Sequence, residues 1–341
     1  MSLQTVYDNT QICKLEEKFS VVKSENTPGA DPKTFLFEGK YPLEPFREGT
    51  RGTYGGEFVA QALVAAYDSI EDKDFDVHSL HSYFLKAGLM DSNMRYEVTI
   101  TSEGRNYCNR LVKCYQIHSN ELCFILMASF TRANSIQQRQ ESFGALDEEK
   151  MNHPRTKVPF EFLREPFYTF DKYKHKLDKL PQLEHTNGNL MHIITPEVWK
   201  ATDKEKLIDP GRREFGIFFK VIDNTKLAEE PRKANMVDFA FASDSFYLST
   251  VMRAVFPLLD YKKDFFRVSL DHTIHFHDTN FDPTEWMFID YKFVRLSNDR
   301  VLVTSLYFTL DRRLVASVLQ EAMALFPLKL ALQSKHGSYK L

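Results

Sequence analysis

The stretch EFVAQALVAAYDSI, residues 57–70, decides the fold of the N-terminal half of this chain. Its apolar residues recur near helical spacing, which predicts one long helix. The extended run KTFLFEGKYPL (33–43) and the glycine-containing turn RGTYGG (51–56) precede that helix. The order predicted here is therefore a strand, a turn and a helix.

Four apolar, alternating runs follow the helix, separated by clusters of Gly, Asn, Asp and Ser that favour turns. They are VHSLHSYFL (77–85), MRYEVTITSEG (94–104), YCNRLVKCYQI (107–117) and ELCFILMASFTR (121–132). A strand, one helix and four more strands predict an α+β module in which a curled antiparallel sheet wraps a mostly apolar helix. This arrangement is the hotdog fold.

The same element order returns in the C-terminal half, which predicts a tandem repeat. The matching segments are EFGIFFKVID (214–223), ASDSFYLSTVMRAVFPLL (242–259), FFRVSLDHTIHFH (265–277), EWMFIDYKFVRL (285–296), VLVTSLYFTL (301–310) and RLVASVLQEAMALF (313–326). We expect a first hotdog module over 1–139 and a second over 210–341. The polar stretch 140–209, with its scattered prolines, is expected to be a linker or surface excursion.

Composition excludes several classes of protein. A net charge of -3 over 341 residues gives no field that attracts nucleic acid. Four cysteines without a C-x-x-C pair predict reduced thiols. The N-terminus does not resemble a signal peptide, and no long apolar run predicts membrane insertion. The ending Tyr339-Lys340-Leu341 shares two residues with the S-K-L peroxisomal address, which leaves a peroxisomal or a cytoplasmic location open.

Motifs of other enzyme classes are missing from the sequence. There is no G-x-S-x-G nucleophile elbow, no P-loop and no G-x-G-x-x-G turn. His275 and His277 share one strand face while His272 points the other way, so one face offers only two metal ligands. We therefore expect neither a metal nor another cofactor.

Three stretches together resemble the acyl-CoA thioesterase II family, which includes bacterial enzymes and the peroxisomal thioesterases of eukaryotes. They are GGEFVAQAL with VHSLHSYFLKAG, ASD with SLDHTIHFHD, and VASVLQEA. The resemblance implies a soluble double-hotdog enzyme whose Asp244, Ser269 and Gln320 position and activate the attacking water. It also implies acyl-CoA as substrate. The glycines that open the first helix expose backbone amides at its positive end, which suits a ligand oxygen as well as a tight turn, and we expect Gly55, Gly56 and His272 to contact the substrate. Bacterial members carry Thr where this chain has Ser269.

Each of the three residues also has a plainer interpretation. Asp244 could cap the N-terminus of the helix that follows it, Ser269 could be an ordinary strand serine, and Gln320 could lie on an exposed face. The first module has Gly55-Gly56 where the second has Ser243-Asp244, and it lacks a counterpart of Gln320. We therefore expect one working site per chain, near the module interface.

The predicted reaction is hydrolysis of acyl-CoA to free fatty acid and CoA. Two other functions stay open at this point: a non-catalytic acyl-CoA binding or sensing protein, and a hotdog enoyl-CoA hydratase. The usual G-D-x-N-P-x-H stretch of such hydratases is absent. Hotdog modules commonly associate through their sheets, so we expect a homodimer or a larger homo-oligomer.

Overall fold

The computed structural model describes residues 11–24, 31–45, 52–184, 188–199, 203–206, 208–255 and 265–326. The C-terminal tripeptide considered above as an address lies outside these ranges. In the described parts of the chain, none of the helices has the length and apolar content needed to cross a membrane.

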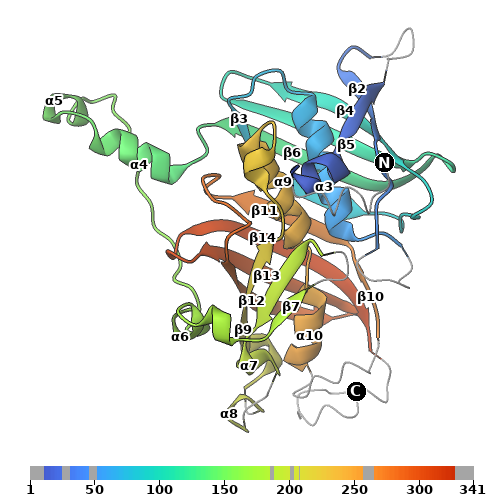
Figure 1. The fold of residues 1–341 in the computed structure, drawn as a ribbon, viewed down its shortest axis with the longest axis vertical. Coiled ribbons are helices and arrows are strands. Elements are labelled where there is room, and N and C mark those ends of the chain that lie inside the picture. The colour runs from blue at the N-terminus through green and yellow to red at the C-terminus, as the bar shows by residue number, and fades with distance from the viewer. Residues whose placement is uncertain are drawn as a thin grey trace.

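The first module is a curled antiparallel sheet around one long helix, α3 (Gly55–Asp68), as the sequence predicts (Figure 1). A short helix, α2 (Lys14–Phe19), packs beside it. The strands are β1 (Val21–Ser24), β2 (Thr34–Gly39), β3 (Phe75–Phe84), β4 (Met94–Glu103), β5 (Tyr107–Gln116) and β6 (Glu121–Arg132).

The second module repeats this plan around α9 (Pro231–Ser243), with the shorter α10 (Tyr247–Val255) after it. Its strands are β9 (Glu214–Val221), β10 (Phe266–Ser269), β11 (Asp271–Phe276), β12 (Met287–Ser297), β13 (Arg300–Thr309) and β14 (Leu314–Leu325). Short 3-10 turns, η2 (Pro210–Arg212) and η3 (Thr225–Leu227), flank β9. The expected α+β double hotdog is confirmed.

The position of the second helix differs from the sequence-based expectation. The segment 242–259 was expected to form the turn and the long helix, but the long helix α9 ends before Asp244. Pro231 occupies the first turn of α9, where a missing N–H costs nothing. This proline, followed by a run of Ala, Met and Phe, is the signal that could have located the helix.

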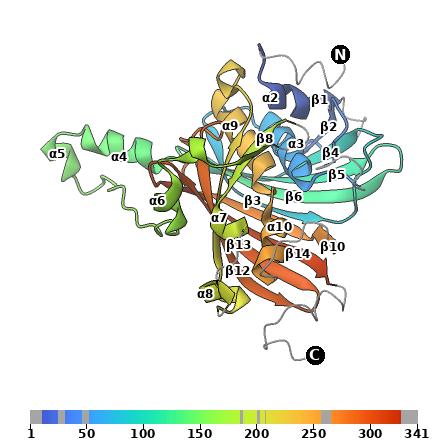
Figure 2. The same cartoon turned by 60° about the horizontal axis from the view of Figure 1, so that its bottom comes forward.

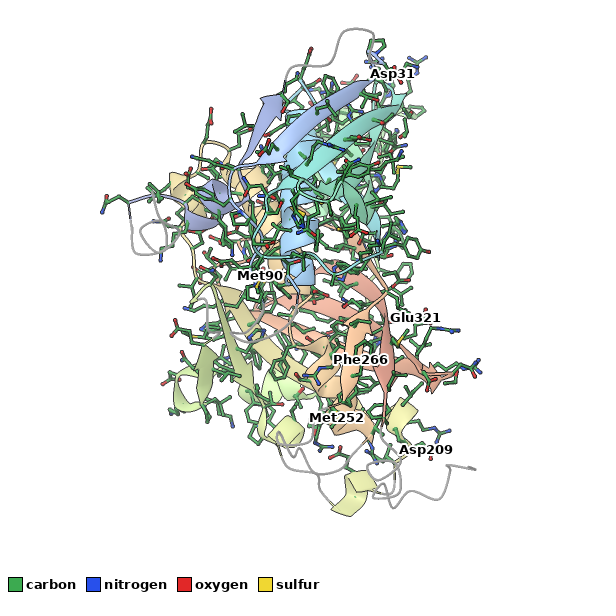
Figure 3. The ribbon with its side chains drawn as sticks, turned by 90° about the vertical axis from the view of Figure 1, so that its right-hand side faces the viewer. Asp31, Met90, Asp209, Met252, Phe266 and Glu321 are labelled. Carbon is green, nitrogen blue, oxygen red and sulfur yellow. The ribbon has the colours of Figure 1, made fainter. Side chains whose placement is uncertain are left out.

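The two sheets join into one 14-stranded sheet through antiparallel pairing of β3 with β11. His272 lies opposite Ser82, and Ile274 lies opposite Leu80. Figure 3 shows the result from the side: Asp31 and Asp209 lie near opposite ends of the molecule. The junction therefore lies at the centre of the sheet.

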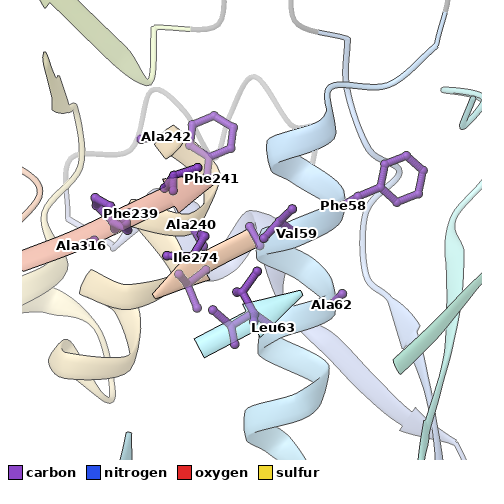
Figure 4. Packing of buried hydrophobic residues seen from close by; sticks show 14 of the residues in the cluster. Phe58, Val59, Ala62, Leu63, Phe239, Ala240, Phe241, Ala242, Ile274 and Ala316 are labelled. Atoms are coloured by element: carbon purple, nitrogen blue, oxygen red, sulfur yellow. The ribbon is translucent and has the colours of Figure 1, made fainter. Parts of the chain in front are cut away.

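The helices α3 and α9 pack antiparallel to each other inside the curled sheet. Lys233, in the first turn of α9, donates to Asp68 at the end of α3. Every residue of α3 from Gly56 to Tyr67 is buried, and a helix enclosed on all sides is apolar all round. Figure 4 shows Val59 and Leu63 of this helix among residues of α9 and near Ile274 of β11.

The segment between the modules forms a projecting arm and then returns to the second sheet. The helices α4 (Ile136–Gly144) and α5 (Glu148–Met151) extend away from the body (Figures 1 and 2). In the extended segment by which the arm returns, Phe160 and Phe162 are 82% and 89% exposed.

Beyond the arm, α6 (Thr169–Tyr173) places Phe170 against Phe218 and Phe288 of the sheet. The remaining elements are η1 (Leu177–Lys179), β7 (Gln182–Glu184), β8 (Leu190–Ile194), α7 (Pro196–Trp199) and α8 (Asp203–Lys206). Strands β8 and β7 extend the sheet beyond β9. The module boundaries at 139 and 209 stay predictions of the sequence.

Candidate active site

The site lies where the end of α9 meets the start of α3. The last carbonyl groups of a helix have no partner within the helix. Here buried tyrosine hydroxyls donate to them: Tyr54 to Phe241 O at 2.9 Å, Tyr307 to Ser243 O at 2.9 Å and, just beyond, Tyr291 to Ser245 O at 3.2 Å. Phe246 then takes a left-handed backbone conformation, with φ 67°, before α10 begins. None of these tyrosines was predicted from the sequence.

Asp244 occupies the residue directly after α9 and is buried. Gln320 Nε2 donates to its Oδ1, and the backbone N–H of Gly56 donates to the same carboxyl group. Burial raises the pKa of Asp244 to about 7, and the two hydrogen bonds act against this rise. The N-cap interpretation of Asp244 is wrong. The residue directly follows α9, and its carboxylate accepts a hydrogen bond from Gly56 of α3 instead of from the helix that follows it.

The two glycines at the start of α3 make room for this carboxylate. A Cβ atom at Gly55 would lie 2.5 Å from Asp244 Oδ2, and one at Gly56 would overlap the carbonyl oxygen of Phe241. Contact of the two glycines with substrate stays a prediction. The backbone N–H of Gly56 donates to Asp244. The positive end of the α3 dipole also faces the carboxylate and stabilises its charged form.

The strands β10, β11 and β14 bring the predicted polar residues onto one face of the sheet. Ser269 lies opposite Ala322, and Thr273 opposite Leu319. These two registers differ by one residue, so the chain is irregular at Leu270. Because of this irregularity, Ser269 and His272 both face inward, although residues three apart in a regular strand point to opposite faces.

His272 is fully buried beside Asp244. Its Nε2 lies 2.9 Å from Ser243 Oγ, and its Nδ1 lies 3.9 Å from Asp244 Oδ1. Burial lowers the pKa of His272 to about 4, so the imidazole is neutral at physiological pH. Asp244 therefore has an uncharged neighbour here in place of a cation.

Ser269 is half-buried, and its Oγ lies 2.7 Å from the hydroxyl of Tyr247, the first residue of α10. Among the described contacts, Ser269 has no hydrogen bond to Asp244. The structure thus brings Asp244, Gln320, His272 and Gly56 together directly, whereas Ser269 is hydrogen-bonded to Tyr247, a buried neighbour of Asp244. Sequence reasoning missed Tyr247, because a tyrosine at the start of a helix has no distinctive signature.

Glu57 is the other buried carboxylate near the start of α3. Burial raises its pKa to about 7 as well, against the opposing effect of Lys18. Lys18 donates to one of its oxygens and the backbone N–H of Glu44 to the other. Glu57 is therefore paired with a lysine cation of α2, whereas the partners of Asp244 are neutral, which makes Asp244 the stronger candidate base.

The remaining histidines of β11 and its flank lie outside this site. His275 faces outward, where its ring packs edge-on against His81, and His277 bonds to Ser317 on the same side. Across the described ranges, no group of three or more His, Cys, Asp or Glu side chains is placed to hold a metal ion.

Comparison with known proteins adds the family to this geometry. Family models match twice: the acyl-CoA thioesterase N-terminal domain over residues 44–131 and the C-terminal domain over 178–324. The chain is 30% identical over 290 residues to human acyl-coenzyme A thioesterase 8, covering 84% of each protein. It is 28% identical to the peroxisomal acyl-coenzyme A thioester hydrolase 1 of Saccharomyces cerevisiae, covering 85% of this chain and 90% of that one.

The fold is also similar to a crystal structure of an acyl-CoA thioesterase II from Mycobacterium marinum. The TM-score is 0.63 at 21% identity, and the match covers 96% of this chain and 99% of that one. Two domain matches in the right order, together with a 30% identical relative aligned along most of its length, lead to one conclusion. The chain belongs to the acyl-CoA thioesterase family, whose members hydrolyse acyl-CoA thioesters.

Proposed function

We propose that this chain hydrolyses fatty acyl-CoA to free fatty acid and CoA by direct attack of a water molecule that Asp244 activates. The observation that carries the proposal is the state of Asp244. It is a buried carboxyl group with a pKa raised to about 7, held between two helix ends by Gln320 and Gly56. A general base works best when its pKa lies near the operating pH.

The chemistry proceeds in two steps. Asp244 takes a proton from water as the water oxygen bonds to the thioester carbonyl carbon, which gives a tetrahedral intermediate. The intermediate collapses, the carbon–sulfur bond breaks, and the proton on Asp244 passes to the departing CoA sulfur. Carboxylic acid and free thiol are the products, and Asp244 returns to its starting state.

The other residues orient the base and the water. Gln320 fixes Oδ1 of Asp244, so the carboxylate cannot rotate freely. The neutral His272 offers a ring nitrogen 3.9 Å from that oxygen, a separation that one water molecule can bridge. The hydroxyl of Ser269 is the third group in our proposal and would hold the water or the thioester oxygen.

The amino end of α3 supplies electrostatic stabilisation. Negative charge develops on the carbonyl oxygen during the attack, and groups already oriented toward that charge lower the barrier. The dipole of the first turn of α3, whose Gly56 N–H donates to Asp244, points to the same place as Asp244. We assign this end of α3 to the developing oxyanion.

The cellular setting is proposed from the relatives. The Saccharomyces cerevisiae protein is named as peroxisomal, and we propose that this chain works on fatty acyl-CoA in the same compartment. Co-localisation of the full chain with a peroxisomal matrix marker is the expected result. A uniformly cytosolic distribution would reject the compartment and leave the reaction untouched.

A thiol-release assay tests the reaction itself. Purified protein is given saturated acyl-CoA of increasing chain length, and free CoA thiol is followed with a thiol-reactive dye. We expect turnover by the wild type and its loss in Asp244→Asn. Tight binding of acyl-CoA without thiol release would identify a binding protein instead of an enzyme.

A further inference from the structure

Four buried tyrosines lie around Asp244: Tyr54, Tyr247, Tyr291 and Tyr307. Burial is the main cause that raises the pKa values of their hydroxyls, and the charge of Asp244 adds to that rise. Three of them donate to backbone carbonyls at the end of α9, as described above. Tyr247 differs, because its hydroxyl is bonded to a side chain of the proposed site, Ser269. This difference suggests a role beyond holding the helix end.

The ring of Tyr247 is fixed in place. Tyr247 is 2% exposed. It is the first residue of α10 and lies three residues after Asp244 in the chain. Its backbone carbonyl accepts from Thr250 Oγ1 at 2.6 Å, and the left-handed Phe246 sets the direction of the chain just before it. A tyrosine held in this way presents its hydroxyl at one position.

Ser269 lacks such restraint of its own. A serine hydroxyl rotates to suit its partners, and Ser269 is the last residue of β10, next to the irregularity at Leu270. The Tyr247 hydroxyl lies 2.7 Å away, an ordinary distance for an O–H···O hydrogen bond. When Tyr247 donates, Ser269 Oγ accepts and its own proton is left to point elsewhere.

We infer that Tyr247 is a positioning residue that fixes the Ser269 hydroxyl as a donor toward the attacking water or the thioester oxygen. The inference rests on the proposed function, because it needs Ser269 to act in hydrolysis. Tyr247 itself need not touch the substrate. Its effect reaches the reaction only through Ser269, and this gives a sharp test.

The test is a double-mutant cycle of Tyr247→Phe and Ser269→Ala, with kcat and KM measured for acyl-CoA hydrolysis. Tyr247→Phe keeps the ring and removes one oxygen. We expect about a tenfold fall in kcat with little change in KM, which is the usual scale for losing one oriented hydrogen bond. In the Ser269→Ala background the same change should have no further effect.

The matched control is Tyr96→Phe. Tyr96 is a buried tyrosine of the first module whose hydroxyl donates to Gln61 Oε1 at 2.7 Å. The Tyr96→Phe variant loses an equivalent buried hydrogen bond, so its drop in melting temperature measures the structural effect of losing such a bond. Its kcat should match the wild type. Ser269→Thr keeps the hydroxyl, so Tyr247→Phe should lower its kcat by the same factor as in the wild type.

The outcomes separate this inference from the proposed function. Wild-type kcat in Tyr247→Phe, or a full additional loss on top of Ser269→Ala, would overturn the positioning role while Ser269 keeps its own. Wild-type kcat in Ser269→Ala would instead remove Ser269 from the mechanism, and the inference with it. A Tyr247→Phe protein less stable than Tyr96→Phe, with kcat per folded molecule unchanged, also rejects positioning.

Discussion

The antiparallel helix pair has two ends built from similar parts, and each end contains a buried aspartate. At the site end, Asp244 meets an amide, a backbone N–H and a neutral imidazole. At the opposite end, where α3 finishes and α9 begins, Asp76 meets the guanidinium of Arg232, with Nε 2.9 Å from Oδ1. A cavity of about 460 Å³ adjoins this second end.

In the proposed mechanism, burial alone does not make a catalytic base. Burial raises the pKa of Asp76 to about 6, but Arg232 and Thr279 act against the rise, and the cation occupies the carboxylate. Asp244 has no such cation beside it: the partners described for its carboxylate, the Gln320 amide and the Gly56 N–H, are both neutral. The two ends of the helix pair therefore differ in the group beside the aspartate. Asp76 has a cation next to it, and Asp244 has neutral partners.

Replacing the base should have the largest effect. Asp244→Asn keeps the shape and the bond from Gln320 but removes the proton acceptor, so kcat should fall by about 10² to 10⁴. The folded-state pKa of Asp244 is raised, so its ionisation reduces stability progressively as pH rises from about 4 to about 7. The stability of the variant relative to the wild type should therefore increase between pH 5 and pH 7 and stay constant from pH 7 to pH 8.

Measurements of kcat and of urea unfolding at these pH values check this prediction. Asp76→Asn serves as the matched control at the other end of the helix pair, where we expect full activity. If Asp244→Asn hydrolysed acyl-CoA at close to the wild-type rate, Asp244 would not be the general base, and the proposed difference between the two aspartates would be wrong.

The pH dependence of the wild type should reveal which aspartate matters. The proposed mechanism needs ionised Asp244, so kcat/KM should rise with pH and level off above an apparent pKa of about 7. Below that value it should fall about tenfold per pH unit. If the pH profile of kcat/KM instead showed an apparent pKa near 6, and replacing Arg232 shifted that value, the titrating group would be Asp76.

Adding a side chain at the second residue of α3 should damage the site end through packing. Gly56→Ala would push a methyl group against the Phe241 carbonyl and the ring of Tyr54. We expect a loss of about 1 to 3 kcal/mol in the free energy of unfolding, the usual range for overpacking a core. Gly144→Ala, at the end of α4 where nothing lies within 4 Å, is the control and should cause no loss of stability.

Removing the cation at the opposite end should have the smallest effect. Arg232→Gln leaves Asp76 buried without its ion pair, so the unfolding free energy should fall by about 1 kcal/mol. Because the pKa of Asp76 is already raised to about 6, the loss should be present at pH 8 and should shrink below pH 6, where the carboxyl group is protonated. Thioesterase activity should stay at the wild-type level, and a parallel fall in kcat would link the two helix ends.

The sequence predicted the fold well where periodicity was strong. The alternating runs that became β4 to β6 and β12 to β14 could be recognised one by one, because each buries one face. The helix α9 was missed, since Asn235 and Asp238 interrupt its apolar pattern.

At the site, the resemblance identified Asp244, Ser269 and Gln320, but their spatial relation could not be read from the sequence. The irregularity at Leu270, which turns Ser269 and His272 to the same side, depends on pairing with β14. The Tyr247 contact depends in turn on the left-handed Phe246. Both arise from tertiary packing, which leaves no local pattern in the sequence.

The β3–β11 junction makes the two halves mutually dependent. If the chain were cut within the arm and the halves made separately, each would present an open strand edge, β3 in one and β11 in the other, and open edges pair with whatever strand they meet. The preferred partner is the missing half, so co-expressed halves should reassemble, while either half alone should aggregate. The carboxylate in one half and the glycines in the other would then form a working site only upon reassembly.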